Sequence, residues 1–196
     1  PSILGEYQVK FPDVTVRLHV ANTEGVLHMV ENNEIDIGIV EGPVNNKNLV
    51  SRVCWDDELV IVTPPGHELA SAGSVAVDQI LEYPFISREE GSGTREVISE
   101  HLNAAGREIA DLNLTMEFGS PESIKSAVTT GLGISILSIA TLDKELKLGL
   151  LSKVSLDPPL KRPFSIVFQR QKFRLRAMDE FLQFTEAHCG EKQTHP

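Results

Sequence analysis

The stretch REEGSGTRE, near the middle of the chain, places hydroxyl and guanidinium groups on a glycine-bearing turn. Its glycines, Gly91 and Gly93, allow another group to approach the backbone closely. Ser92 and Thr94 add hydroxyl donors, and Arg95 adds a positive charge that can hold a carboxylate or another oxyanion. Two interpretations are open: an oxyanion or carboxylate clamp, or a strand-to-helix turn in which Ser92 or Thr94 only caps the helix.

The same turn lacks the signatures of three phosphate-binding or catalytic loops. A dinucleotide-binding GxGxxG pattern would need glycine where Glu96 stands. The GK[ST] ending of a P-loop is absent, and the GxSxG motif of a nucleophile elbow does not occur around Ser92. Glu89, Glu90 and Glu96 also crowd the turn with negative charge, which limits its affinity for multiply charged phosphates. We therefore expect neither a phosphate cradle nor a nucleophile loop.

Two other expected helix starts could also attract an anion, because the first N–H groups of a helix lack partners and carry partial positive charge. Asn22 and Thr23 follow one expected strand, and the SPES sequence that begins at Ser120 follows another. Ser120 suits the N-cap and Pro121 the first helical position. If two sheets face one another, these helix starts would meet over one crevice.

The remaining polar candidates favour structural roles. The six histidines show neither HExxH nor another ligand spacing, so we expect no metal and no cofactor. Lys125 could face an anion, but a solvated helix surface is favoured. Asp36 is expected to bond nearby backbone at a strand entry, and Trp55 is either a core or an interface anchor. No convergent acid and base points to an enzyme.

The elements that would position these groups alternate strands with helices, which predicts an α/β fold with parallel sheets and crossover connections. Alternating or apolar runs predict strands at 14–20, 35–42, 82–87, 112–118, 133–138 and 162–170, with two more within 49–63. Helical spacing and capping residues predict helices from about 23, at 92–105, at 121–130 and at 174–189. The last helix is expected to pack on the first half of the chain.

Composition restricts the class of protein. The chain has 196 residues, 41% of them hydrophobic, which is enough for a real core. Its formal charge of -10 repels nucleic acid and anionic lipid surfaces. No apolar run approaches the roughly 18 to 20 residues of a membrane span, and no secretion signal opens the chain. Cys54 and Cys189 lie far apart without a CxxC pairing, so no disulfide framework is indicated and a reducing compartment fits best.

Taken in order, four motifs resemble the effector-binding domain of LysR-type transcriptional regulators. They are KFPDVTVRLHVANTEGVLHMVENNEIDIGIV, DDELVIVTPPGHELA, YPFISREEGSGTR and SIKSAVTTGLGISILS. The resemblance covers nearly the whole chain and implies a type II periplasmic-binding-protein-like fold, in which two α/β subdomains flank a ligand cleft. We expect one subdomain from 1–67 and 168–196 and the other from 68–167. Within the family, the chain is similar to CysL-type regulators of sulfur assimilation, and less so to regulators of carbon dioxide fixation, which implies a small anionic effector.

Position by position, the resemblance implies effector contacts from both subdomains. In the first they lie after a strand, and in the second they lie on one wall and at the helix start opposite it. The implied contact residues are Thr23, Ser87, Gly91, Ser92, Gly93, Thr94, Arg95, Ser120, Pro121 and Glu122. The family's first strand would precede Pro1, so the resemblance leaves one wall of the site undefined.

The resemblance also implies partners and a location. In the family, a winged helix-turn-helix and a linker helix precede the sensor, and the full protein binds promoter DNA as a dimer of dimers in the cytoplasm. We therefore expect a homodimer, a tetramer in the full-length protein, DNA contact only through the missing N-terminal domain, and no membrane contact. The alternatives are a solute-binding protein of a transport system or a small-acid enzyme on the same scaffold.

Overall fold

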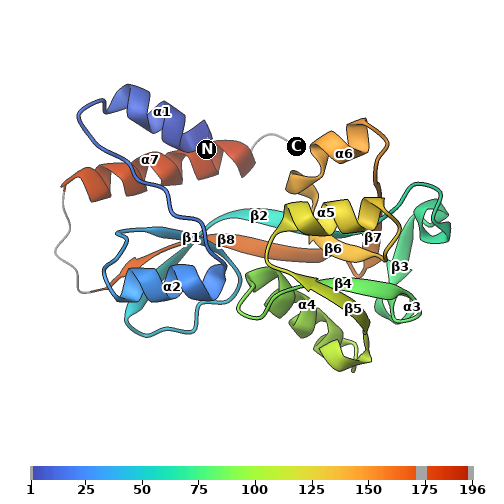
Figure 1. Ribbon diagram of the computed structural model, residues 1–196. Coiled ribbons are helices and arrows are strands. Elements are labelled where there is room, and N and C mark those ends of the chain that lie inside the picture. Colours follow the sequence, from blue (N-terminus) through green and yellow to red (C-terminus); the bar gives the residue numbers. More distant parts are fainter. Residues whose placement is uncertain (1, 171–175, 194–196) are drawn as a thin grey trace. The chain divides into compact units, whose positions relative to one another are not determined.

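The computed structural model describes residues 2–170 and 176–193 (Figure 1). The chain forms two compact units: unit 1 comprises Pro1–Trp55 and Pro163–Pro196, and unit 2 comprises Asp56–Arg162. The chain thus leaves unit 1 after Trp55 and returns after Arg162. The subdomain bounds expected from the sequence were 67/68 and 167/168. Both passages lie inside long strands, which carry no loop-like composition to mark them.

The described residues of unit 1 combine helices with an antiparallel pair of strands. Its elements are α1 (Ser2–Lys10), α2 (Thr23–Glu31), β1 (Gly38–Glu41), the first part of β2 (Leu49–Thr63), most of β8 (Leu160–Gln169) and α7 (Arg176–Gln193). β1 pairs antiparallel with β8, with Gly38 opposite Val167. A Cβ at Gly38 would lie 2.5 Å from Val26 Cγ1 of α2, so the absence of a side chain lets α2 lie close against the strand.

The last helix packs on the first half of the chain, as expected from the sequence, and its contacts there include α1. The hydroxyl of Tyr7, on α1, donates to the carbonyl oxygen of Ala177, on α7, at 3.2 Å. The Tyr7 ring, which is 1% exposed, also meets the rings of Phe181 and Phe184 edge-on. Aromatic contacts of this geometry hold the two ends of the chain together in unit 1.

The alternating segment 14–20 is not a strand, so that prediction was wrong. It forms no regular element, and within it Leu18 is 63% and Val20 is 89% exposed. A strand requires a neighbouring strand for its backbone hydrogen bonds, and no strand among the described residues pairs with this segment. The residue pattern alone cannot supply that neighbour.

The cysteine spacing indicated no disulfide framework, and that expectation was also wrong, because Cys54 is disulfide-bonded. Cys54 is buried on β2 in a cluster with Met178 and Leu182 of α7. Separation along the sequence had suggested separation in space, but the packing of α7 against β2 removes that argument. The side chain of Cys189 lies outside the described residues.

Unit 2 contains the helices that begin at the candidate turns. Its elements are the rest of β2, β3 (Ser74–Ala76), α3 (Val77–Ile80), β4 (Pro84–Arg88), α4 (Gly93–Ala104), β5 (Asn113–Phe118), α5 (Pro121–Thr129), β6 (Ser135–Ser138), α6 (Asp143–Lys147), β7 (Ser152–Asp157) and the start of β8, with short 3-10 turns at Glu68–Ser71, Ile109–Asp111 and Ile139–Thr141. None of the described helices is both long and apolar enough to cross a membrane.

The sheets of unit 2 are mixed rather than parallel throughout. β4 and β5 pair in parallel with α4 as their crossover, as expected. β2, however, pairs antiparallel with β6 and β7, and β7 pairs in parallel with β3. β2 is one strand of 15 residues where two were expected, and neither glycine nor proline interrupts it. β7 was not anticipated from the sequence.

The core of unit 2 lies on both faces of β2. Leu59 and Ile61 point into a cluster with Val97 and Leu102 of α4. Val60 points into a second cluster, which contains Ile124 and Val128 of α5. Because side chains alternate along a strand, α4 and α5 cover opposite faces of the sheet. This packing fixes both helix starts relative to β4 and β6.

Candidate functional site

The turn between β4 and α4 is formed by a glycine with positive φ and by backbone hydrogen bonds. Gly91 adopts φ +77°, a left-handed conformation that favours glycine. The N–H of Ser92 donates to the carbonyl oxygen of Glu89 at 3.2 Å, and the N–H of Glu96 donates to that of Ser92 at 3.0 Å. Ser92 is therefore the N-cap residue, and the helix begins at Gly93.

The side chain of Ser92 does not cap the helix. It is 2% exposed, and its Oγ has no hydrogen-bond partner among the described residues. A buried hydroxyl without a partner costs about 1–3 kcal/mol, so most native structures avoid one. The interpretation of the turn as a simple capped helix start is therefore wrong for Ser92. The turn instead holds a buried polar atom beside the N–H groups that open α4.

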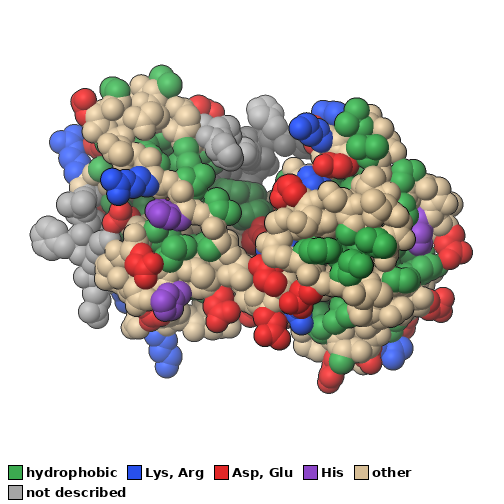
Figure 2. All heavy atoms as spheres, viewed as in Figure 1, with side chains coloured by type: hydrophobic (Ala, Val, Ile, Leu, Met, Phe, Trp, Pro, Cys, Tyr) green, Lys and Arg blue, Asp and Glu red, His purple; other side chains and the backbone are tan. Residues whose placement is uncertain are grey.

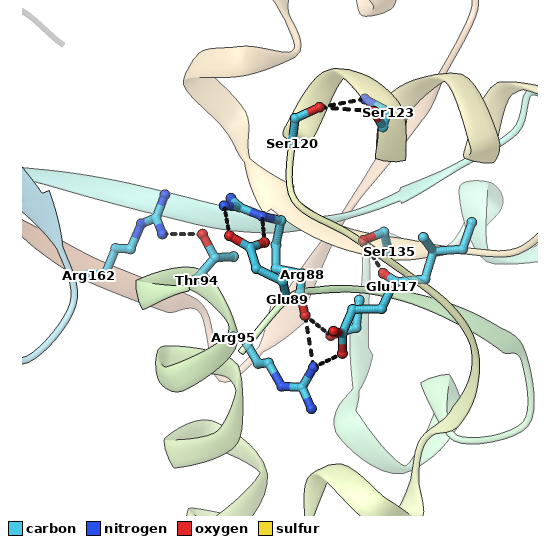
Figure 3. A network of polar contacts seen from close by, with 11 residues as sticks. Arg88, Glu89, Thr94, Arg95, Glu117, Ser120, Ser123, Ser135 and Arg162 are labelled. Atoms are coloured by element: carbon cyan, nitrogen blue, oxygen red, sulfur yellow. Dashed lines mark hydrogen bonds and ion pairs between the residues drawn. The ribbon is translucent and has the colours of Figure 1, made fainter. Parts of the chain in front are cut away.

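Thr94 is held by a buried arginine. Its Oγ1 accepts a hydrogen bond of 2.7 Å from Arg162 Nη1, and Thr94 is 3% exposed (Figure 3). The Nε and Nη2 atoms of Arg162 each lie 2.9 Å from Asp57 Oδ2, and Asp57 Oδ1 accepts from Ser138 Oγ at 2.8 Å. Four buried side chains from β2, α4, β6 and β8 are thus connected, and the cluster includes an ion pair between Asp57 and Arg162.

Sequence reasoning did not identify the buried residues that hold Thr94. They lie on three strands that are distant in sequence, and no spacing connects them. A weak signal was present, because each is polar or charged in or beside a run of apolar strand residues. The missed residues are Asp57, Ser138 and Arg162.

Arg95 turns away from this cluster. Its Nη1 donates to the carbonyl oxygen of Arg88 at 2.9 Å and forms an ion pair with Glu117 of β5. Figure 3 shows the Arg95 side chain directed toward Glu117 rather than toward Arg162. Arg88 itself pairs with Glu89 through two bonds of 2.8 and 3.1 Å. The arginines of this region are therefore engaged with carboxylates.

The strand end before the turn adds one more buried hydroxyl. Ser87, on β4, is 3% exposed, and its Oγ donates to the carbonyl oxygen of Arg88 at 3.0 Å. On the neighbouring β6, Ser135 Oγ donates to the carbonyl oxygen of Ile86 at 2.6 Å. These bonds satisfy the hydroxyls within unit 2, so Ser87 differs from Ser92 in having a partner.

The start of α5 is capped as the sequence predicts. Ser120 Oγ accepts from the N–H of Ser123 at 3.2 Å and lies 3.0 Å from Ser123 Oγ (Figure 3). Pro121 is the first helical residue. The Glu122 side chain is 74% exposed and lies 3.6 Å from Lys125 Nζ. Capping alone accounts for the type of residue at 120 and 121.

Lys125 is not a solvated surface residue, so that expectation was wrong. Its side chain is only 12% exposed, and Nζ lies 3.0 Å from Glu145 Oε1 and 3.0 Å from the carbonyl oxygen of Thr141. The hydrogen bond from Lys125 lowers the pKa of the Glu145 carboxyl below its usual value. Lys125 thus ties α5 to α6.

In unit 1, Thr23 is the first residue of α2 and is 7% exposed. Its Oγ1 lies 3.5 Å from the carbonyl oxygen of Glu41, to which it donates. The cap is made by Asn22, whose Oδ1 accepts from the N–H of Gly25 at 3.0 Å. Among the described residues, no group of three or more His, Cys, Asp or Glu side chains could hold a metal ion.

Comparison with known proteins identifies relatives along nearly the whole chain. The family model described as "LysR substrate binding domain" matches residues 1–190. The transcriptional regulator YeiE of Escherichia coli K12, itself described as uncharacterized, is 35% identical over 95% of this chain and 62% of its own length. The transcriptional activator CmpR of Synechocystis is 31% identical over 96% of this chain and 61% of its own length. The chain therefore spans about three fifths of these curated relatives.

Solved structures agree in fold. The regulatory domain of CcmR from Synechocystis, in complex with 2-PG, is 32% identical, with a TM-score of 0.88 over 96% of this chain and 90% of that domain. The effector-binding domain of QuiR, in complex with shikimate, is 18% identical with a TM-score of 0.87, over 97% of this chain and 90% of that domain, which shows a shared fold. The α/β, periplasmic-binding-protein-like fold is thereby confirmed, whereas the CysL-like subgroup is not. The chain belongs to the LysR substrate-binding domain family.

Proposed function

We propose that the chain is the effector-sensing region of a LysR-type transcriptional regulator and that it binds a small anionic metabolite at the start of α4. The observation that carries the proposal is the Ser92 hydroxyl, which is buried at a helix start without a partner among the described residues. The first N–H groups of α4 and the positive end of the helix dipole favour an anion there. A bound oxyanion would accept hydrogen bonds from these N–H groups and from the Ser92 hydroxyl.

The proposed contacts in unit 2 centre on Ser92 and the neighbouring backbone of Gly91, Gly93 and Thr94. Ser87 lies at the end of the adjacent strand. Arg95 is proposed with a lesser part, because its guanidinium is already engaged by Glu117. Ser120, Pro121 and Glu122 at the start of α5, and Thr23 in unit 1, stay predictions, as does the ligand cleft between two subdomains.

The class of ligand follows from charge. Arg88, Arg95 and Arg162 each face a carboxylate, so the anion would be held mainly by neutral N–H and O–H dipoles. The relative CcmR was solved with 2-PG, which supports a small ligand for this chain. A solute-binding protein and an enzyme are less favoured, because the curated relatives are named as transcriptional regulators.

Thermal unfolding with a panel of sulfate, phosphate, 2-PG and shikimate tests the proposal. A ligand at 100 times its dissociation constant adds about 2.7 kcal/mol to the free energy of unfolding. We expect at least one anion of the panel to raise the melting temperature of the chain but not that of Ser92→Ala. Equal stabilisation of both proteins, or no stabilisation by any compound, would contradict the site.

We further propose that the chain pairs as a homodimer and that the full-length protein is a cytoplasmic tetramer without membrane contact, which binds promoter DNA through an N-terminal domain. Every residue of β5 except Phe118 is exposed, including Leu114 at 41% and Met116 at 38%. Apolar side chains gather on this face of unit 2 (Figure 2). An exposed edge strand with apolar residues is a typical pairing surface.

The coding sequence upstream of the chain distinguishes the proposed regulator from a transport protein. A helix-turn-helix supports the regulator, whereas an export signal supports the solute-binding alternative. Turnover of small acids by the purified chain would instead support an enzyme.

A further inference from the structure

We propose that Arg162 is a positioning residue, which holds the first turn of α4 in the conformation that binds the anion. The inference rests on the anion site proposed above. Arg162 is absent from the residues that the family resemblance implies as effector contacts, and its position follows only from the packing of β8 against β2 and α4.

The guanidinium of Arg162 is held by hydrogen bonds on both of its sides. Two of its nitrogens, Nε and Nη2, bind the same oxygen of Asp57 at 2.9 Å. Asp57 is itself held by Ser138 Oγ, which donates to the other carboxylate oxygen at 2.8 Å. Because the guanidinium is planar and rigid, these bonds fix the direction in which Nη1 points, and Thr94 Oγ1 lies there at 2.7 Å.

Arg162, held in this orientation, fixes the side chain of Thr94, which lies two residues after Ser92. An arginine can only donate, so Thr94 Oγ1 must accept, and its rotamer is set by a side chain outside the helix. Ser92, Thr94 and Arg162 are each at most 3% exposed, so solvent does not compete for these bonds. The cluster therefore fixes the helix start from which the N–H groups and the Ser92 hydroxyl are presented.

The same cluster joins the two strands by which the chain passes between its compact units. Asp57 and Arg162 lie on β2 and β8, at the first and last positions of unit 2 to within one residue. Hydrophobic residues can often replace a buried ion pair without loss of stability, so the burial of this pair does not by itself indicate a stabilising role. Because Arg162 also bonds to Thr94, the role of the pair is instead to position the first turn of α4.

The test measures binding of inorganic phosphate to the 196-residue chain. Thr94→Val is expected to raise the dissociation constant about tenfold, and Thr94→Ser, which keeps the acceptor, to stay within about twofold of the unmodified chain. The pair Asp57→Asn and Arg162→Gln removes both charges together, so that no unpaired ion remains buried. In that double variant we expect an increase of about tenfold, with little further effect of Thr94→Val.

A second measurement does not depend on phosphate. Hydrogen exchange of the Glu96 amide, which bonds to the Ser92 carbonyl oxygen at 3.0 Å, should become about tenfold faster in the double variant. The Ile124 amide, which bonds to the Ser120 carbonyl oxygen at the start of α5, should be unchanged. A general loss of stability would accelerate both amides, so the comparison separates positioning from folding.

Arg107→Gln is the matched control. Arg107 pairs with Asp78 in unit 2 at 2.7 Å, with side chains 43% and 64% exposed, and should alter neither measurement. If the unmodified chain fails to bind phosphate but Glu96 exchange responds as expected, the phosphate site fails and the positioning of α4 stands. Unchanged Glu96 exchange in the folded double variant, or unchanged phosphate affinity, would overturn the inference.

Discussion

The guanidinium of Arg162 and the carboxylate of Asp57 form an ion pair in which neither side chain is more than 3% exposed. Each charge in such a pair depends on the other, because removal from water costs several kcal/mol per ion and only the partner offsets it. The pair joins β2 to β8 and, through Thr94, both strands to α4. Removal of one charged side chain should therefore lower the free energy of unfolding more than removal of both.

Substitution of one member of this pair is expected to destabilise unit 2 strongly. Arg162→Met leaves the Asp57 carboxylate buried without its cation and should lower the free energy of unfolding by about 3–5 kcal/mol in urea titrations. Asp57→Asn combined with Arg162→Gln should lower it by less. A single variant as stable as the double variant would contradict the coupling between the two charges.

Ser92 and Ser120 are both N-cap residues, yet their replacement by alanine should act in opposite directions. Ser92→Ala removes a buried hydroxyl without a partner among the described residues and should raise the free energy of unfolding by about 1 kcal/mol. Ser120→Ala removes the acceptor of the Ser123 N–H and should lower it by about 1 kcal/mol.

Anion binding completes this comparison. Ser92→Ala should reduce the increase in melting temperature caused by the anion panel, although it stabilises the chain without ligand. A buried hydroxyl that lowers the stability of the chain is explained if it binds a ligand. Chemical denaturation and thermal shifts on the same preparations measure both effects. If Ser92→Ala destabilises the chain as Ser120→Ala does, the hydroxyl has a structural partner and the argument for a ligand there fails.

The ion pair between Glu145 and Lys125 predicts a pH dependence. The hydrogen bond from Lys125 lowers the pKa of the Glu145 carboxyl in the folded chain. The stabilisation is therefore complete above the usual glutamate pKa of about 4.3 and is lost as the pH falls through the lower folded pKa. Unfolding midpoints measured from about pH 6 to about pH 3 should fall less steeply for Glu145→Gln than for the unmodified chain.

An exposed acidic residue on the same helix provides the control. Asp143 pairs with Lys147 on α6, with side chains 72% and 74% exposed, so Asp143→Asn should keep the pH dependence of the unmodified chain. Parallel curves for Glu145→Gln and the unmodified chain would show that the bond to Lys125 does not stabilise the fold.

The exposed strand β5 predicts where the homodimer forms. Met116→Lys places a charge on a surface that is proposed to be buried by a second copy, so the dissociation constant of the dimer should rise at least about tenfold. Leu148→Lys, at a position on the end of α6 that is 69% exposed, should not change it. Analytical ultracentrifugation at micromolar concentration measures both, and a monomeric unmodified chain would contradict the proposal.

Much of the local structure could be predicted from the sequence. The helices α4 and α5, the strands β4, β5 and β6, and the cap at Ser120 follow from periodicity and capping residues, which act between near neighbours in the chain. The order of the four motifs was enough to indicate the family. These features need no knowledge of which distant segments meet.

Local patterns failed where a partner from elsewhere in the chain decides the outcome. The segment 14–20 has the alternation of a strand but no neighbour among the described residues to pair with. Cys54 is disulfide-bonded although the cysteine spacing suggested otherwise. Lys125 lies on a helix face that would be solvated in isolation and is covered by α6.

The sequence by itself determined the family and the helix starts after Ser92 and Ser120. Only the tertiary structure decided how the polar groups at α4 are used: Arg162 binds Thr94, Arg95 turns to Glu117, and the Ser92 hydroxyl is left buried. The reason is physical. Helix propensity and capping depend on residues three or four apart, whereas a buried hydrogen bond depends on strand pairing that brings distant residues together and excludes water.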